Sequence, residues 1–215
     1  KLPQASIRAT SFRTNPLPAL TSGGLSTPRF TLRRREDGGF SVGLSGRGRL
    51  EITPQGLRYA RDFWRFYLSR RDKVSLRLGR SFVEGPEAAT RWSLDGPSPF
   101  ERVRVLDPKP QQALIDTALS AMADTFPALR GVRVLQSWGG AIDWTPDGLP
   151  VIARIATLPG LVVAAGFSGH GFGVGPAAGH LAADLATGDA PIVDPRPFRH
   201  ERLIDGSVLP VPGMV

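Results

Sequence analysis

A glycine-rich segment, GFSGHGFG at residues 166–173, limits what this chain can fold into more than any other feature. A short apolar run, residues 161–165, precedes it, and a run of small residues, 177–186, follows. Pro176 suits the first turn of a helix and Thr187-Gly188 its end. The order predicts a buried strand, a glycine loop and a helix. Such a loop lets a ligand approach the backbone closely, so the segment is typical of a cofactor site, although an ordinary tight turn has the same pattern.

The composition narrows the class of protein. The chain has 215 residues, 41% hydrophobic and 21% charged, as in soluble globular proteins of one large or two small domains. It has no cysteine, which excludes disulfides, thiolate metal sites and a cysteine-linked cofactor. No apolar run approaches the roughly 20 residues that span a bilayer, and no signal peptide is visible, so we expect a cytoplasmic protein. Because the chain starts at Lys1 rather than Met, we expect a fragment or one piece of a processed protein.

The net charge of +8 is unevenly distributed. Residues 1–106 hold 20 basic and 9 acidic side chains, whereas residues 107–215 hold 7 and 10. Such asymmetry occurs in nucleic-acid-binding proteins. The alternative is that these basic residues, mostly arginines, are solvated or face a partner surface. We favour this alternative because the sequence has no helix-turn-helix, zinc finger or RNP motif.

The rest of the chain predicts an α+β fold with an antiparallel sheet, because several strands have one polar face. Asp37-Gly38 predicts a hairpin, and Thr53 and Asp107 each predict the start of a helix, the second ending near Pro127. The apolar face of the first helix is expected to carry Leu57, Ala60, Trp64 and Leu68, with Phe63 and Tyr67 beside them. The expected strands are residues 2–14, 30–32, 40–44, 74–78, 103–105, 132–136 and 151–153, and the expected loops are residues 21–24, 47–49 and 84–99.

Three motifs stand in order in the C-terminal third: a turn at Trp138-Gly139-Gly140, TPDGLP at residues 145–150, and the glycine loop. With the DGGFSVG hairpin at residues 37–43, this order resembles the C-terminal half of the D-amino-acid oxidase superfamily of FAD-dependent oxidoreductases. That superfamily includes glycine oxidase, sarcosine oxidase and opine-oxidase-type β subunits. The resemblance covers most of residues 1–205 and is most specific over residues 138–202.

The resemblance implies a divided fold. Family members begin with a GxGxxG loop that binds the FAD pyrophosphate, and this sequence has no such loop followed by an acidic residue on a second strand. Residues 1–12 would end the N-terminal half of the FAD-binding domain, residues 13–137 would form an antiparallel-sheet substrate-binding domain with flanking helices, and residues 138–215 would form the C-terminal part of the FAD-binding domain and a tail. The GxGxxG half is then expected as a partner, and an oligomer is possible.

The resemblance also implies which residues meet the cofactor. FAD would bind non-covalently with its ring against the glycine loop, and the enzyme would oxidise the C–N bond of an amine or amino acid by hydride transfer to the flavin. His170, the only ionisable residue of the loop, is the expected catalytic residue, although a loop histidine bonded to backbone is the alternative. No metal is expected, since three histidines argue against a metal centre. The expected cofactor-binding residues are Gly139, Gly166, Phe167, Ser168, Gly169, His170, Gly171, Phe172 and Gly173.

Two departures from the family leave the substrate open. Ile142 stands where glycine and D-amino-acid oxidases have a carboxylate-binding arginine. Gly173 stands where sarcosine-oxidase-type enzymes often have a lysine. Arg47 or Arg49, from the basic first half, is a candidate replacement for these carboxylate-binding residues.

Further expectations concern the neighbouring side chains and the chain as a whole. We expect Trp138 and Trp144 to pack rather than to wall the substrate pocket, and Asp147 to bond backbone N–H groups in its own turn. The chain alone is expected to be inactive and to bind FAD weakly or not at all. The competing hypothesis is a non-catalytic basic interaction domain that binds nucleic acid or a partner protein, although we expect no nucleic-acid partner.

Overall fold

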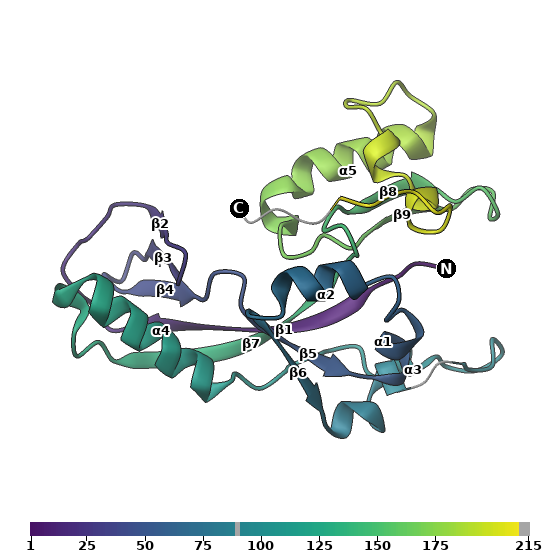
Figure 1. Ribbon diagram of the computed structural model, residues 1–215. Coiled ribbons are helices and arrows are strands. Elements are labelled where there is room, and N and C mark those ends of the chain that lie inside the picture. The colour runs from purple at the N-terminus through teal and green to yellow at the C-terminus, as the bar shows by residue number, and fades with distance from the viewer. Residues whose placement is uncertain (89–90, 211–215) are drawn as a thin grey trace.

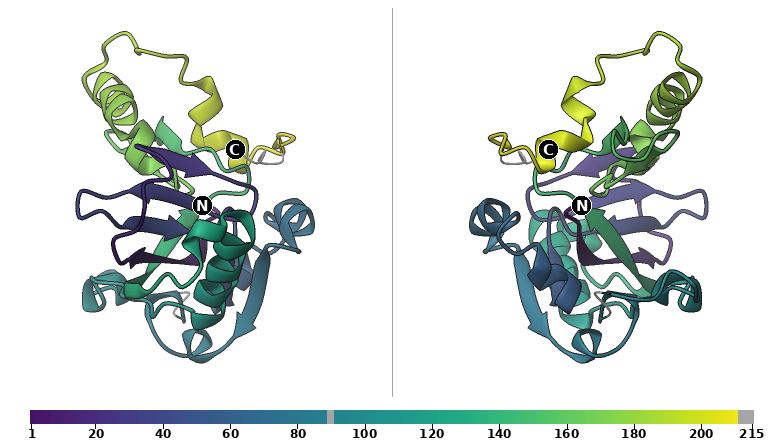
Figure 2. Two further views of the ribbon diagram at one scale, coloured as in Figure 1. Left: turned by 90° about the vertical axis from the view of Figure 1, so that its left-hand side faces the viewer. Right: turned by 90° about the vertical axis from the view of Figure 1, so that its right-hand side faces the viewer.

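A computed structural model describes residues 1–88 and 91–210 (Figure 1). A seven-stranded sheet carries most of the helices, and a smaller unit of two strands and one long helix stands on one side of it (Figures 1 and 2). The strands are β1 (Ala5–Thr14), β2 (Gly24–Ser26), β3 (Thr31–Arg34), β4 (Phe40–Gly43), β5 (Gly48–Ile52), β6 (Val74–Leu78), β7 (Val134–Trp144), β8 (Val151–Arg154) and β9 (Val162–Ala165). The α-helices are α1 (Pro54–Arg58), α2 (Trp64–Arg70), α3 (Pro99–Arg102), α4 (Gln112–Thr125) and α5 (Gly171–Thr187).

Strand β1 is the centre of the large sheet, and its two halves are buried on opposite faces. Ala5 and Ile7 pack with Phe66 of α2 on one face, whereas Phe12 packs with Met122 of α4 on the other. On one edge, β1 pairs first with β5 and then with β4, and on the other edge it pairs with β7 along its whole length. One strand therefore carries two separate hydrophobic cores, and the predicted half-buried strand is confirmed.

The predicted turn at Trp138-Gly139-Gly140 is wrong. These residues lie in the middle of β7, where Trp138 pairs with Ser11 and Gly139 with Thr10. A Cβ atom at Gly139 would collide with the carbonyl oxygen of Pro108, which crosses the strand there. The glycine is needed for this close approach of a second backbone, a requirement that looks like a turn signal in the sequence.

The hairpin of β3 and β4 around Asp37-Gly38 is confirmed, but the sheet differs from the prediction in two places. Strand β2, antiparallel to β3, is an additional strand that starts at the last residue of the expected loop 21–24. Strand β5 begins within the expected loop 47–49, at Gly48, and pairs with β6 in parallel, so the sheet is mixed rather than antiparallel. Arg49 is held within this strand by an ion pair with the buried Glu51, whose Oε1 lies 2.6 Å from the arginine Nε.

The single helix expected after Thr53 is two helices, α1 and α2. Thr53 does cap α1, because its Oγ1 accepts a hydrogen bond of 3.0 Å from the Gly56 N–H. The break between the helices changes the rotational phase, so the predicted apolar face is wrong: Leu57 and Trp64 are 55% and 59% exposed. Phe63, expected beside that face, is buried, and Tyr59 and Phe66 are buried with it.

The second predicted helix begins later than expected. Helix α4 starts at Gln112, because the proline-rich segment before it, with Pro108 and Pro110, crosses β7 in an extended form. The N–H of Gln111 donates a hydrogen bond of 3.0 Å to Thr10 Oγ1 on β1. The strand expected at residues 103–105 is absent from this described part of the chain. Residues 86–88 of the expected loop 84–99 form a 3-10 turn, and residues 89–90 lie outside the described residues.

The smaller unit contains the strand, loop and helix predicted at the outset. Strands β8 and β9 pair antiparallel, and α5 covers one face of them with Ala178 and Leu181 against Ile152. Helix α5 begins at Gly171, so Pro176 lies inside it rather than in its first turn, and the predicted start is wrong by about one turn. The C-terminal 3-10 turns, Arg196–Phe198 and His200–Leu203, pack on the β8–β9 hairpin.

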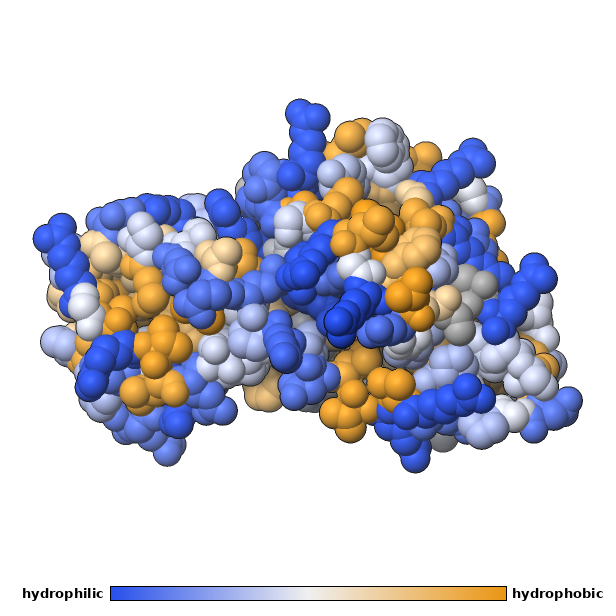
Figure 3. Space-filling view, turned by 90° about the horizontal axis from the view of Figure 1, so that it is seen from below, coloured by the Kyte–Doolittle hydropathy of each residue, from blue (hydrophilic) through white to orange (hydrophobic). Residues whose placement is uncertain are grey.

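Apolar side chains are exposed among the arginines of the first half. Figure 3 shows patches of hydrophobic side chains between hydrophilic ones on the underside of the molecule. The exposed apolar residues in this part of the sequence include Leu76, Leu78, Val83 and Phe100. The surface of residues 1–106 is therefore mixed rather than uniformly basic.

Candidate functional site

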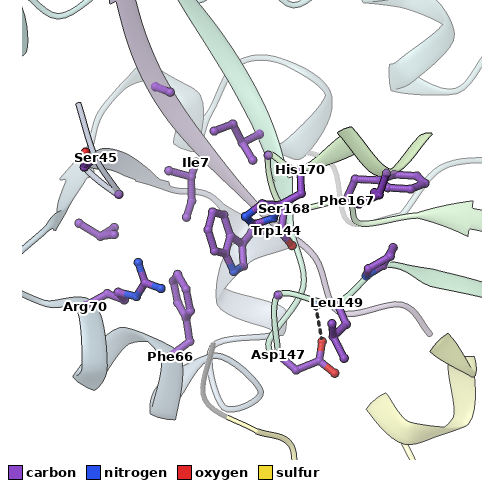
Figure 4. Close-up of a pocket in the computed structure, with 18 of the residues that line it drawn as sticks. Ile7, Ser45, Phe66, Arg70, Trp144, Asp147, Leu149, Phe167, Ser168 and His170 are labelled. Atoms are coloured by element: carbon purple, nitrogen blue, oxygen red, sulfur yellow. Dashed lines mark hydrogen bonds between the residues drawn. The ribbon is translucent and has the colours of Figure 1, made fainter. Parts of the chain in front are cut away.

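A cavity of about 920 Å³ lies where the large sheet meets the smaller unit (Figure 4). One wall comes from β1 and α2, with Ile7 and Phe66, and the other from the glycine loop. Trp144, at the end of β7, stands between the two walls, 5.3 Å from the Phe66 ring and 6.4 Å from the His170 ring. The cavity therefore joins residues that are more than 160 positions apart in the sequence.

The glycine loop has an unusual backbone. Gly166, Ser168 and Gly169 all have positive φ angles, of 74°, 52° and 87°. Ser168 is the only residue other than glycine with a positive φ in the described ranges, 1–88 and 91–210. Its buried Oγ accepts a hydrogen bond of 3.2 Å from the Thr145 N–H and lies 3.2 Å from the Gly166 carbonyl oxygen, to which it donates. Contacts with β7 and the following turn hold this strained conformation.

Asp143, one residue before Trp144, anchors the same loop. Its carboxylate Oδ2 accepts hydrogen bonds from the Gly166 N–H at 2.9 Å and from the Gln4 amide at 2.6 Å. Its backbone carbonyl accepts the Ser168 N–H at 2.9 Å. Partial burial raises the pKa of the Asp143 carboxyl, and the two hydrogen bonds oppose this shift.

The structure brings four of the predicted cofactor-binding residues to the cavity. Phe167, Ser168, Gly169 and His170 line it. Gly166, Gly171, Phe172 and Gly173 belong to the same loop and helix start but lie beside the cavity rather than in its wall, and the Phe172 side chain is 99% exposed. Gly139 lies apart, in the middle of β7 against Pro108.

His170 stands at the junction of the loop and α5. It is the residue immediately before the first turn of the helix, and its side chain is exposed toward the cavity. Its ring meets the edge of Trp144 (Figure 4). The imidazole is therefore accessible to a molecule that occupies the cavity.

The opposite end of the cavity is basic. Arg47, Arg70 and Lys73 line it, close to the turn at Ser45-Gly46. Arg70 is buried, 7% exposed, and its guanidinium lies against Gly46 (Figure 4). Arg49, the other candidate from the sequence, is not among the residues that line this cavity, and it is paired with Glu51.

Sequence reasoning did not find Arg70, although a signal existed. Arg70 lies four residues after Phe66 and seven after Phe63, which places it on the buried face of α2. An arginine at a core-facing helical position is uncommon and points either to an ion pair or to a ligand. The incorrect helical phase assigned to residues 53–68 hid this position.

The sequence predicts packing roles for Trp138 and Trp144 and a turn role for Asp147. Trp138 lies outside the cavity, whereas Trp144 packs against Phe66, as expected, and also lines the cavity. The turn role of Asp147 is confirmed, since its Oδ1 accepts the Leu149 N–H at 3.2 Å (Figure 4). Asp147 also forms a fully buried ion pair with Arg202, with 2.7 Å between Oδ2 and Nε, which the sequence did not predict.

Within residues 1–88 and 91–210, no three acidic or histidine side chains gather as a metal site requires. In the same described part of the chain, no helix is long and apolar enough to cross a membrane.

Comparison with known sequences gives a family. A family model described as FAD dependent oxidoreductase matches residues 1–185. The chain is 31% identical over 144 residues to sarcosine oxidase subunit beta of Rhizobium meliloti, an alignment that covers 67% of this chain and 30% of that protein. It is 30% identical over 95 residues to glycine oxidase of Pseudomonas putida, covering 44% of this chain and 26% of that protein.

Comparison with solved structures gives the same fold. L-amino acid deaminase from Proteus myxofaciens, solved with anthranilate, matches with a TM-score of 0.84 and 26% identity over 94% of this chain and 45% of that one. The Proteus vulgaris enzyme matches with a TM-score of 0.83 and 24% identity over 94% and 47%. The chain spans less than half the length of these relatives. Its matched residues, its mixed sheet and its strand, glycine loop and helix together show that it belongs to the D-amino-acid oxidase family of FAD-dependent oxidoreductases.

Proposed function

We propose that this chain supplies the substrate-binding part and the flavin-ring side of an enzyme that oxidises the C–N bond of an amino acid or amine. One observation carries the proposal: the cavity has the glycine loop and His170 at one end and the basic side chains of Arg47, Arg70 and Lys73 at the other. The wall between them is apolar. Such a cavity can hold an amino acid by its carboxylate while its amine lies toward the loop.

The residues around the loop fit a flavin ring. The indole Nε1 of Trp144 is buried and has no acceptor within residues 1–88 and 91–210, so it is a donor available to a bound group after a small rearrangement. Gly173 and Gly175 have no other heavy atom within 4 Å of a Cβ position, so the helix leaves space beside them. The 215-residue sequence contains no GxGxxG loop to bind the pyrophosphate of FAD.

When bound, FAD supplies the two-electron acceptor for the C–H bond beside the amine nitrogen. The chain's own residues would position and stabilise the reactants. The start of α5 presents free N–H groups and the positive end of its dipole, which favours negative charge next to the loop. His170 would exchange a proton with the substrate amine, and the apolar wall would exclude water from the reacting carbon.

Arg70 is the proposed carboxylate-binding residue. It is buried at the basic end of the cavity, and a guanidinium binds a carboxylate with two parallel hydrogen bonds. Arg47 and Lys73 would add positive charge at this end. These residues would take the place of the arginine that Ile142 replaces, so the substrate class of the proposal is an amino acid with an apolar side chain.

The test is anaerobic reduction of the assembled enzyme. This chain, purified together with the polypeptide that supplies the GxGxxG half, should be yellow and should bleach when an apolar amino acid is added. Arg70→Met should raise KM for that amino acid about ten- to hundredfold, because a charge-assisted pair is lost. Arg71→Met, a neighbouring exposed arginine, is the matched control and should leave KM unchanged. An assembled preparation without flavin contradicts the proposal.

A further inference from the structure

The glycine loop is held in place by a residue outside it. Asp143 contributes both acceptors that hold the loop backbone: its carboxylate Oδ2 takes the Gly166 N–H at 2.9 Å, and its carbonyl takes the Ser168 N–H at 2.9 Å. The same carboxylate oxygen takes a third hydrogen bond, of 2.6 Å, from the Gln4 amide. One residue therefore joins the start of β1, the end of β7 and the loop.

The loop requires such support because its own conformation is unfavourable. Ser168 has a φ of 52° in the left-handed region, which is unfavourable for a residue with a side chain because its Cβ lies too close to the neighbouring carbonyl oxygen. Gly166 is confined as well, since a Cβ atom there would collide with the Thr145 side chain. The hydrogen bond that the Gly166 N–H donates to Asp143 and the one that the Thr145 N–H donates to Ser168 offset the cost. Without them, glycine-rich backbone has many other conformations of similar energy.

The hydrogen bonds of Asp143 also fix the position of the loop relative to the opposite wall of the cavity. Gln4 directly precedes β1, whose Ile7 lines the cavity across from His170. Asp143 pairs with Ser6 in the β1–β7 ladder, so its position is fixed by the sheet. A displacement of the loop relative to the sheet would change the distance between the two walls, and this distance decides how a substrate meets His170.

We propose that Asp143 is a positioning residue, whose carboxylate holds the Gly166–His170 loop at a fixed distance from the substrate-binding sheet. The role needs an acceptor rather than a charge, because the two donors to the Asp143 carboxylate, the Gly166 N–H and the Gln4 side-chain amide, meet the same oxygen atom. An asparagine amide oxygen can accept both hydrogen bonds, whereas an alanine can accept neither. The importance of the loop rests on the proposed function, but the positioning itself does not.

Amide hydrogen exchange in this 215-residue chain, without FAD, tests the proposal. Asp143→Ala should speed exchange at the Gly166 amide on the order of ten- to hundredfold, and Asp143→Asn should restore protection to near that of the unsubstituted chain. The amide of Met122, in α4 on the far side of the sheet, is the internal control and should not change. Equal exchange at Gly166 in all three proteins, or Asn no better than Ala, would overturn the proposal.

A milder variant covers the case in which Asp143→Ala does not fold. Gln4→Leu removes only the side-chain amide that donates from the residue before β1, and it leaves Asp143 in place. It should raise the Gly166 exchange rate severalfold while the thermal unfolding midpoint stays close to that of the unsubstituted chain. An unchanged exchange rate at Gly166 in Gln4→Leu would contradict the link to the sheet. Because neither measurement involves flavin, a failed reconstitution and a failed positioning role are told apart.

Discussion

At the scale of single residues, the buried ion pair of Asp147 and Arg202 connects the turn after β7 to the C-terminal segment. The side chains are 0% and 5% exposed, and the guanidinium also donates to the carbonyl oxygens of Leu149 and Arg199, each at 2.8 Å. Every acceptor around the arginine comes from a chain terminus or turn without regular structure. The pair therefore joins the turn after β7 to the 3-10 turn His200–Leu203, whose Leu203 packs beside it on Val151.

Removing the arginine should destabilise the chain strongly. Arg202→Met leaves the Asp147 carboxylate buried without its partner, and the free energy of unfolding should fall by about 3–5 kcal/mol. Urea unfolding followed by tryptophan fluorescence measures this change. Arg196→Met, which breaks only the exposed pair with Asp194, is the control and should leave the midpoint nearly unchanged. A similar midpoint for both variants would show that the buried pair is not important for stability.

Asp143 should make stability depend on pH. Because its pKa is raised in the folded chain, the folded state favours the protonated carboxyl, and this contribution is complete below the ordinary value of 3.8 and is lost as the pH rises through the raised pKa. Asp143→Asn removes the titration. The free energy of unfolding of the native chain, relative to the Asn variant, should therefore fall as the pH rises above 3.8 through the raised pKa. A difference that does not vary across this range would contradict the raised pKa.

At the scale of elements, α5 is a helix with several residues that disfavour helix formation. It contains Pro176 in its interior and glycines at 173, 175 and 179. Pro176 has no N–H to donate to the carbonyl oxygen four residues earlier. The helix is maintained by burial of Ala178 and Leu181 on the β8–β9 hairpin. Packing, rather than intrinsic propensity, decides this element.

The glycine at 179 gives a test of that argument. It is exposed, its φ is not in the left-handed region, and a Cβ atom there would have no heavy atom within 4 Å. Gly179→Ala should raise the free energy of unfolding by about 0.5–1 kcal/mol, because alanine loses less conformational entropy in a helix. Gly166→Ala is the contrasting variant and should be destabilising, because its φ is 74° and Thr145 occupies the Cβ position. Thermal unfolding of both variants measures the two effects.

At the scale of the whole molecule, the cavity is formed by two units that the chain joins twice. Residues 1–4 run from the smaller unit into β1, with the carbonyl of Lys1 2.6 Å from His200 Nε2, and residues 145–150 connect β7 to β8. The large sheet supplies the basic end of the cavity and the smaller unit supplies the loop. The division of the chain into domains at residues 12 and 137 stays a prediction.

The whole chain should bind FAD weakly when it is alone. Residues 166–173 offer contacts for a ring, but most of the contacts that FAD needs, above all those to its pyrophosphate, come from a GxGxxG loop that this sequence lacks. Equilibrium dialysis should show little retention of FAD by the isolated chain and strong retention after assembly with the GxGxxG half. Tight binding of FAD by residues 1–215 alone would contradict this expectation.

The sequence by itself determined the local elements and the family. Strict alternation predicted β1, Asp37-Gly38 predicted the β3–β4 hairpin, and the order of apolar run, glycines and small residues predicted β9, the loop and α5. These signals succeed because each depends on neighbours within a few positions. The family resemblance came from the order of sequence motifs, including residues 138–140, whose predicted turn was wrong, and the DGGFSVG hairpin at residues 37–43.

Only the tertiary structure decided the long-range contacts that form the site. The pairing of Ser11 with Trp138, the burial of Arg70, and the hydrogen bond from Gly166 to Asp143 join positions far apart in the chain. Local periodicity contains no information on such partners, and a glycine that admits a crossing backbone has the same local signature as a glycine in a turn. The sequence predicted the glycine loop. It did not predict that Asp143 holds the loop or that Trp144 and Arg70 line the same cavity, because these contacts depend on how the sheet folds.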